Sequence, residues 1–142
     1  MANAPSKDVV DELVSAGVAT YKNTSGWGLW LAREPVTPDT AISVFDAGGD
    51  SPNPKYRLNE PTVQVRIRGA KWGYKAAYTK AQAVVDALLG IGKKTINSTV
   101  YVGIWQLGDI IFIGFDDNNR PVFTTNWRVV REVSTSTYRA QA

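Results

Sequence analysis

Residues 61–89, PTVQVRIRGAKWGYKAAYTKAQAVVDALL, carry the clearest signal of the fold because a strand pattern runs directly into a helix pattern. Side chains alternate along a strand, so Pro61–Arg68 places its valines and Ile67 on one face and Gln64, Arg66 and Arg68 on the other. In Tyr74–Leu89 the residues at positions 77, 81, 84, 85 and 88 follow helical spacing. We expect the apolar strand face to pack on this helix. The arginine face must then meet water, an acidic partner or a polyanion.

The remaining patterns predict one more helix and several strands. The helix is expected over Lys7–Ala16, with Ser6 as its N-cap and Gly17 as its stop. Strands are expected at Trp27–Leu31, Ala41–Asp46, Val100–Gln106, Ile110–Phe115 and Val122–Val133. Long loops are expected at Ala47–Asn59 and Gly90–Thr99, a hairpin turn at Asp116–Pro121, and a flexible tail at Ser134–Ala142.

Length and composition indicate one domain over residues 1–142 and argue against several classes of protein. The 142-residue chain is 44% hydrophobic and can bury a real core. No apolar run approaches the ~18 residues of a membrane span, and the first residues lack the pattern of a signal peptide. The absence of cysteine fits cytoplasmic synthesis. The chain has neither cysteine nor histidine, which excludes disulfides, thiolate metal sites and catalytic sites built on Ser-His-Asp or Cys-His.

The remaining candidates for chemistry are weak, so we expect no enzyme, cofactor or metal. The loop at Gly48-Gly49 lacks the Lys-Ser/Thr ending of a phosphate cradle. Asp116–Asn119 has oxygen ligands without the spacing of an EF-hand, which favours a solvated turn. None of the four glutamates is followed two residues later by the lysine of a restriction-type nuclease. A carboxylate enzyme stays a distant third hypothesis, because it would need two acidic residues converging in a pocket.

Charge is segregated along the chain. Residues 1–54 carry 3 Lys/Arg and 7 Asp/Glu, residues 55–80 carry 7 and 1, and residues 81–142 carry 6 and 5. An acidic first third followed by a basic middle can drive head-to-tail association of copies, because such contacts join two different surfaces. The alternative is two solvated faces that never meet.

A basic and aromatic cluster gives the candidate site. Its members are Arg66, Arg68, Lys71, Trp72, Lys75 and Lys80, and Arg128 lies on the polar side of the last strand. We rank a subunit interface first, a solvated surface second and direct nucleic-acid binding third. The interface hypothesis predicts that charge reversal at Arg66 or Arg68 blocks assembly without unfolding the chain. Trp27 and Trp30 more often fill a core than form a ligand platform. They are three apart, so they do not share one face of a strand, and at least one of them is expected at a surface or interface.

The order of motifs resembles a known family. The matching pieces are AISVFDAGG at 41–49, PTVQVRIRG at 61–69, the helix at 74–89 and IGFDDNNRPVFTTNWR at 113–128. Together with the first helix they resemble the bacteriophage minor capsid or tail-terminator (tail-completion) proteins of long-tailed phages. No single motif is diagnostic, and the case rests on shared order and spacing. Asn119 stands where relatives often have Gly, which suits the same turn because Asn tolerates positive φ.

The resemblance implies an α+β fold, with a mostly antiparallel sheet and both helices packed on one face. It also implies a virion protein, assembled in the host cytoplasm, that forms a ring, commonly a hexamer, on the head-proximal end of the tail tube. The implied partners are other copies of the chain, the tail tube protein, the head–tail connector or stopper, and genome DNA passing through the lumen without sequence readout. It implies no catalysis, cofactor or membrane. Another head–tail joining protein and a small basic nucleic-acid-binding module stay open as alternatives.

Overall fold

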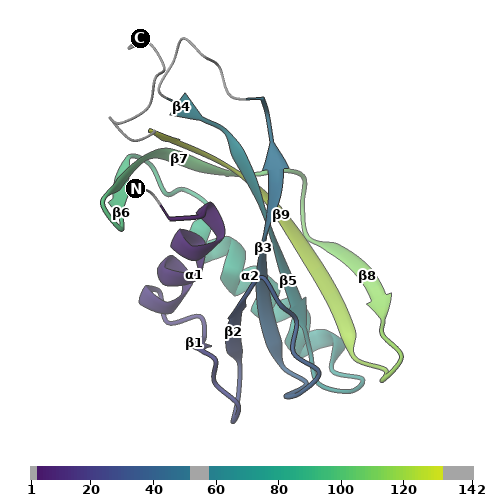
Figure 1. Cartoon of the computed structure of the whole chain (residues 1–142). Helices are drawn as coiled ribbons and strands as arrows, with labels where there is room; N and C mark the ends of the chain where they lie inside the picture. The colour runs from purple at the N-terminus through teal and green to yellow at the C-terminus, as the bar shows by residue number, and fades with distance from the viewer. Residues whose placement is uncertain (1–2, 52–57, 133–142) are drawn as a thin grey trace.

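The computed structural model describes residues 3–51 and 58–132. Two helices and nine strands lie in these ranges (Figure 1). The helices are α1 (Pro5–Ser15) and α2 (Tyr74–Leu88). The strands are β1 (Thr20–Tyr21), β2 (Gly28–Leu31), β3 (Ala41–Gly49), β4 (Leu58–Asn59), β5 (Pro61–Arg68), β6 (Lys94–Ile96), β7 (Thr99–Gln106), β8 (Ile111–Phe115) and β9 (Pro121–Glu132).

The strands form one sheet in the order β1-β2-β3-β5-β9-β7-β6, with β4 and β8 also paired to β9. The pairs β1–β2 and β2–β3 are parallel and every other pair in the described ranges is antiparallel. Residues 122–124 of β9 pair with β5 on one edge and β8 on the other, so β8 lies across β9 from β5. The predicted α+β class with a mostly antiparallel sheet is confirmed.

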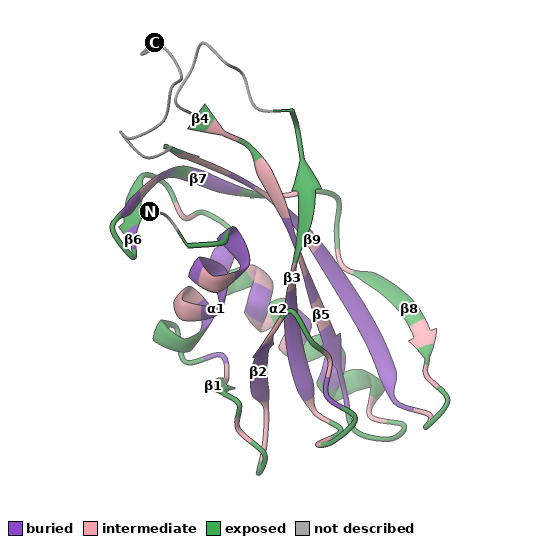
Figure 2. Ribbon diagram, viewed as in Figure 1, coloured by how far each residue is buried: buried purple, intermediate pink, exposed green. Residues whose placement is uncertain are grey.

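The core lies between the sheet and the two helices. Val63, Val65 and Ile67 of β5 are fully buried, as the alternation predicts. They join one cluster with residues of both helices, including Ala77, Ala81, Val84 and Leu88 of α2. Figure 2 shows the buried residues concentrated along β9, β5 and the inner sides of the helices. Burial of Val84 or Leu88 contributes about 1.5–3 kcal/mol each before conformational entropy is subtracted.

The last strand also follows its predicted pattern. Phe123, Thr125, Trp127 and Val129 are buried together on the face of β9 that meets the helices. Thr125 Oγ1 accepts a 2.8 Å hydrogen bond from the indole nitrogen of Trp127, which satisfies a buried donor. The turn before β9 is the predicted hairpin, and Asn119 adopts a φ of +60° there.

The first helix begins earlier than predicted. It starts at Pro5, and Ala4 rather than Ser6 occupies the N-cap. Ser6 instead donates from its backbone N–H and its hydroxyl to the Asp46 carboxylate, at 3.0 and 2.8 Å. A tertiary hydrogen bond therefore replaces the local cap. The stop at Gly17 is confirmed by its φ of +75°, a conformation that glycine adopts without strain.

Both predicted long loops contain strand. β3 continues to Gly49, which pairs with Pro61, because the glycine lets the chain bend through a bulge after Asp46. β6 lies inside the predicted loop at Gly90–Thr99 and pairs with β7. Residues 52–57, Val133 and the predicted tail at 134–142 lie outside the described residues.

The parallel pair β2–β3 requires a crossover, and here residues 32–40 supply it without a helix. The carbonyl oxygens of Pro38 and Asp39 accept hydrogen bonds from Arg68, which points to the face away from the helices. The crossover therefore covers one end of that second face. This covering decides where the predicted site residues lie.

Candidate interaction surfaces

Arg68 is buried beneath the crossover. Only 3% of its surface is exposed. Its Nε donates to the Asp39 carbonyl at 2.9 Å, its Nη2 to the Pro38 carbonyl at 2.7 Å, and its Nη1 lies 3.3 Å from the Glu34 carboxylate. Burial, together with nearby Arg120, lowers the pKa of Arg68 from its usual value, but a guanidinium stays charged. The expectation that this residue lies on an uncovered charged face is wrong.

Arg66 shares the same carboxylate. Its Nε lies 2.8 Å from Glu34, and about a third of its side chain is exposed. Glu34 therefore neutralises much of the positive charge that the alternating arginines bring to β5. The sequence did not point to Glu34, because it lies 32 residues from Arg66.

A second buried arginine secures the same crossover. Arg120 donates to the Val36 carbonyl at 2.7 Å and pairs with Asp116 at 2.8 Å and Asp39 at 3.3 Å. Burial alone would raise the pKa of Asp116. The carboxylate also accepts hydrogen bonds from the backbone N–H and side chain of Arg120 and from the Asn118 N–H, and together these lower the pKa by more than burial raises it. The pKa of Asp116 therefore lies below its usual value. The turn motif Asp116–Arg120 thus has a structural role.

The other predicted site residues lie elsewhere. Lys71 and Trp72 are exposed in the turn between β5 and α2, and Lys75 is exposed on α2. Arg128 is half-buried in β9, on the face away from the helices, and its Nε has no hydrogen-bond partner in the described part of the chain. Lys80 donates to the Val18 carbonyl at 2.9 Å and lies 5.4 Å from the centre of the Trp27 ring. Of the predicted cluster, Arg66, Arg68 and Lys80 thus contact groups of the chain itself, which leaves less of its charge for a nucleic acid.

Aromatic side chains gather on the opposite flank of α2 from Trp27. We call Trp72, Tyr74, Tyr78, Phe112 and Phe115 the aromatic surface. Its rings form a chain of contacts with centroid distances of 5.0–5.6 Å, partly through the buried ring of Phe123. All five residues are exposed, and Trp72 is 63% exposed. An exposed aromatic group of this extent is typical of a protein–protein contact.

The neighbouring strand adds an open sheet edge. β8 reads IFIGF, without a charge or a proline, and its large side chains are exposed on both faces (Figure 2). It pairs with β9 on one side, and no strand of the described ranges pairs with the other side. Such an edge is a template for pairing with another chain unless something covers it. The sequence held one signal of this exposed edge. Ile111–Ile113 is an unbroken apolar run, whereas a strand with one face in water should alternate apolar and polar residues.

An apolar groove lies on the other flank of α2. It is lined by Trp27, Lys75, Ala76, Thr79, Lys80 and Ala83. Small residues on this side of the helix leave the Trp27 ring partly uncovered, while Trp30, in β2, is largely buried. Trp27 is partly exposed at this groove, which agrees with the prediction that at least one of the two tryptophans lies at a surface.

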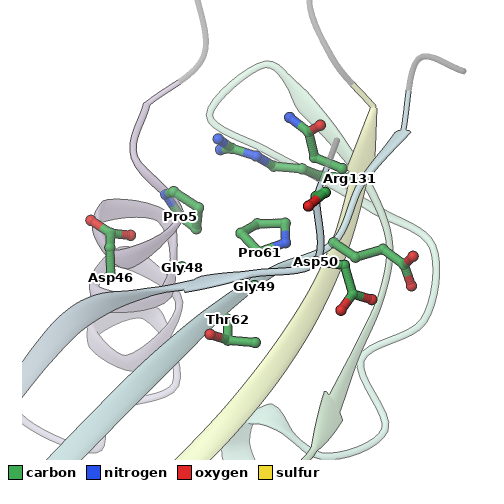
Figure 3. Close-up of a pocket in the computed structure, with 11 residues that line it drawn as sticks. Pro5, Asp46, Gly48, Gly49, Asp50, Pro61, Thr62 and Arg131 are labelled. Carbon is green, nitrogen blue, oxygen red and sulfur yellow. The ribbon is translucent and has the colours of Figure 1, made fainter. Parts of the chain in front are cut away.

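A third concave site lies at the far end of the sheet, where Pro5 and Pro61 face each other below Arg131 (Figure 3). Asp46, Asp50 and Glu60 also line it. Asp46 accepts a hydrogen bond from Ser6, and Arg131 donates to the Asn3 carbonyl at 2.6 Å, so both side chains already have partners within the chain.

Within residues 3–51 and 58–132, no three acidic or other ligand side chains are grouped to hold a metal ion. Neither described helix has the length and hydropathy that a membrane crossing requires.

Comparison with known proteins gives one family. The model of the family described as "Bacteriophage tail terminator protein" matches residues 12–133, which is most of the chain. A comparison with curated proteins gave no match. The matched range includes both flanks of α2, β8 and the crossover with its two arginines.

Proposed function

The chain belongs to the bacteriophage tail terminator family, and on that premise we propose that copies of it close into a ring on the head-proximal end of the tail tube. Its role in tail completion is structural. The observation that carries the ring proposal is the exposed aromatic surface beside the open edge of β8. A lone copy leaves this apolar area in water, whereas an assembled copy buries it.

Ring closure also requires two different surfaces on each copy, since a contact between identical patches stops at a dimer. The chain supplies an exposed apolar edge at β8 and a separate apolar groove beside Trp27. A hexamer is the expected ring. Its two open ends would contact the tail tube protein and the head connector, which ends tube polymerisation and joins the tail to the head.

Genome DNA would pass through the lumen of such a ring. Contacts to phosphate groups carry no sequence information, so passage needs no base readout. Arg128, Lys71 and the exposed part of Arg66 are the candidates for lumen contacts, whereas Arg68 is too buried to touch DNA directly. The protein would occupy the tail of the virion after assembly in the host cytoplasm.

The test is the mass of the full chain by light scattering, alone and with its tail tube protein. A closed ring in either sample, together with shortened or capped tubes in electron micrographs, is the expected result. A chain that stays monomeric and leaves tube length unchanged would contradict the proposal. It would bring forward the alternatives of another head–tail joining role or a nucleic-acid-binding module, which a DNA shift assay at two salt concentrations would test.

A further inference from the structure

We infer that the ring contact joins the aromatic surface and β8 of one copy to the groove between α2 and Trp27 of the next copy. This inference rests on the proposed ring and names the residues that form its contact. The occupant of the aromatic surface is thus a second copy of this chain, bound head to tail.

The two surfaces lie on different sides of α2. Successive residues of a helix are about 100° apart, and the buried stripe of α2 contains Ala77, Ala81 and Val84. Tyr74 and Tyr78 lie on one side of that stripe, and Ala76 and Ala83 lie on the other. β8 and the β1–β2 pair also lie at opposite edges of the sheet (Figure 1). Each copy therefore presents two different surfaces on separate sides, and a cyclic contact needs two different surfaces on each copy.

The two surfaces also match in shape and character. The aromatic surface carries large exposed side chains, whereas the groove is lined by alanines and the side of an indole ring. Large rings against small residues allow close packing of the kind found at the centre of protein interfaces.

Charged residues of opposite sign border the two surfaces. Asp109 and Asp117, both exposed, lie just before and after β8. Lys75 and Lys80 lie at the groove. Asp117 and Lys75 have no charged partner in the part of the chain that the structure describes. Opposite charges around an apolar contact orient two copies and disfavour contacts between two like surfaces.

The backbone of Trp72 is strained. This residue adopts a φ of +60°, in a region that L-residues with large side chains rarely occupy, and its ring is the most exposed of the aromatic surface. Folding gains little from an exposed tryptophan in that conformation. A tryptophan that anchors a contact between copies explains why it is there.

The first experiment compares Trp72→Asp, Ala76→Glu and Val36→Asp with the unchanged chain, by light scattering alone and with the tube protein. Aspartate tolerates the backbone of Trp72, and Ala76 is exposed in the first turn of α2, where a glutamate is well accommodated. Circular dichroism and the melting temperature should therefore show folded chains. Both variants should lose the ring. Val36→Asp is the matched control, because Val36 is exposed but lies in the crossover, outside both surfaces, and it should keep the ring.

Mixing the two variants tests the head-to-tail geometry. The Trp72→Asp chain keeps an intact groove, and the Ala76→Glu chain keeps an intact aromatic surface. Their mixture should give a one-to-one pair and nothing larger, although neither variant associates alone.

The outcomes separate this inference from the proposed ring. Rings that persist in both variants would overturn the inference while leaving the proposed function standing. Variants that keep the ring but no longer bind the tube would show that the tube protein covers the aromatic surface, which also overturns it. An unchanged chain that forms no ring, alone or on the tube, would overturn the proposed function itself.

Discussion

Tyr101 donates the hydrogen bond of its phenol to the carboxylate of Asp8, although 93 residues separate them in the chain. Both side chains are fully buried. The carboxylate also accepts a 2.7 Å hydrogen bond from Asn97 and lies 3.7 Å from Arg131. Burial, followed by the bond to Asp8, raises the pKa of Tyr101 well above its usual value. This buried network fixes the first turn of α1 against β7 and β9.

Tyr101→Phe should therefore destabilise the fold. The change removes one donor from a buried carboxylate, and hydrogen bonds to charged groups contribute about 1.5–3 kcal/mol, so we expect a loss of about 2 kcal/mol in the free energy of unfolding. Urea denaturation followed by tryptophan fluorescence measures it. Tyr78→Phe removes the same hydroxyl from an exposed tyrosine and should change little. Equal losses in the two variants would show that the network contributes nothing.

Arg68 and Arg66 should differ in their effect on folding. Arg68→Met leaves the Pro38 and Asp39 carbonyls and one oxygen of the Glu34 carboxylate without the buried donor. We therefore expect the free energy of unfolding to fall by about 3 kcal/mol. Arg66→Met breaks a half-exposed ion pair, which contributes about 1 kcal/mol or less. The same urea assay compares the two variants.

Charge reversal should also separate the two arginines. The sequence predicted that reversal at either one blocks assembly and leaves the chain folded. That outcome is now expected for Arg66 alone, because reversal at Arg68 would bury a carboxylate beside Glu34. A folded Arg68→Met chain as stable as Arg66→Met would contradict this assignment.

Asp116→Asn should alter the dependence of stability on pH. The folded pKa of Asp116 lies below its ordinary value of 3.8, so its contribution is present above that value and is lost as the pH falls through the lower folded pKa. The variant should be less stable than the unchanged chain by about 1–2 kcal/mol at pH 7, with the difference shrinking in acid. Unfolding curves at a series of pH values measure the difference. Asp117→Asn, at the exposed neighbouring position, is the control. A difference that stays constant down to pH 2 would rule out this role for the Asp116 carboxylate.

Two adjacent glycines should respond differently to alanine. A Cβ at Gly49 would lie 2.4 Å from the Glu60 carbonyl oxygen, at a φ of +129°, so the bulge between β3 and β5 must open. We expect Gly49→Ala to lower the free energy of unfolding by roughly 3 kcal/mol or more. Gly48→Ala meets no atom within 4 Å, so only its backbone conformation is strained, at a cost of about 1–2 kcal/mol. Melting temperatures rank the two variants. The reverse order would mean that β3 does not continue through Gly49.

Elements whose evidence is local could be predicted from the sequence. The alternation along Pro61–Arg68 predicted the buried face of β5, and the helical spacing in Tyr74–Leu89 predicted the buried stripe of α2. Burial of apolar side chains at a period of 2 or 3.6 residues can be read from neighbouring positions alone, because each residue's face follows from the backbone geometry. The turn at Asp116–Pro121 and the helix stop at Gly17 were equally local, since their chemistry involves adjacent residues.

Two features could be seen only in the tertiary structure: which charged side chains are buried against partners, and which apolar side chains lie together on the surface. Arg68 lies on the strand face opposite Ile67, as the alternation predicts. It is nevertheless buried, because the crossover of residues 32–40 lies over it. Tyr74 and Phe112 are 38 positions apart, and only the pairing of β8 with β9 brings their rings to 5.0 Å. The period of a strand says which face a side chain occupies. What lies over that face depends on where distant segments of the chain return, and the partners that bury a charge or join an aromatic group come from those segments.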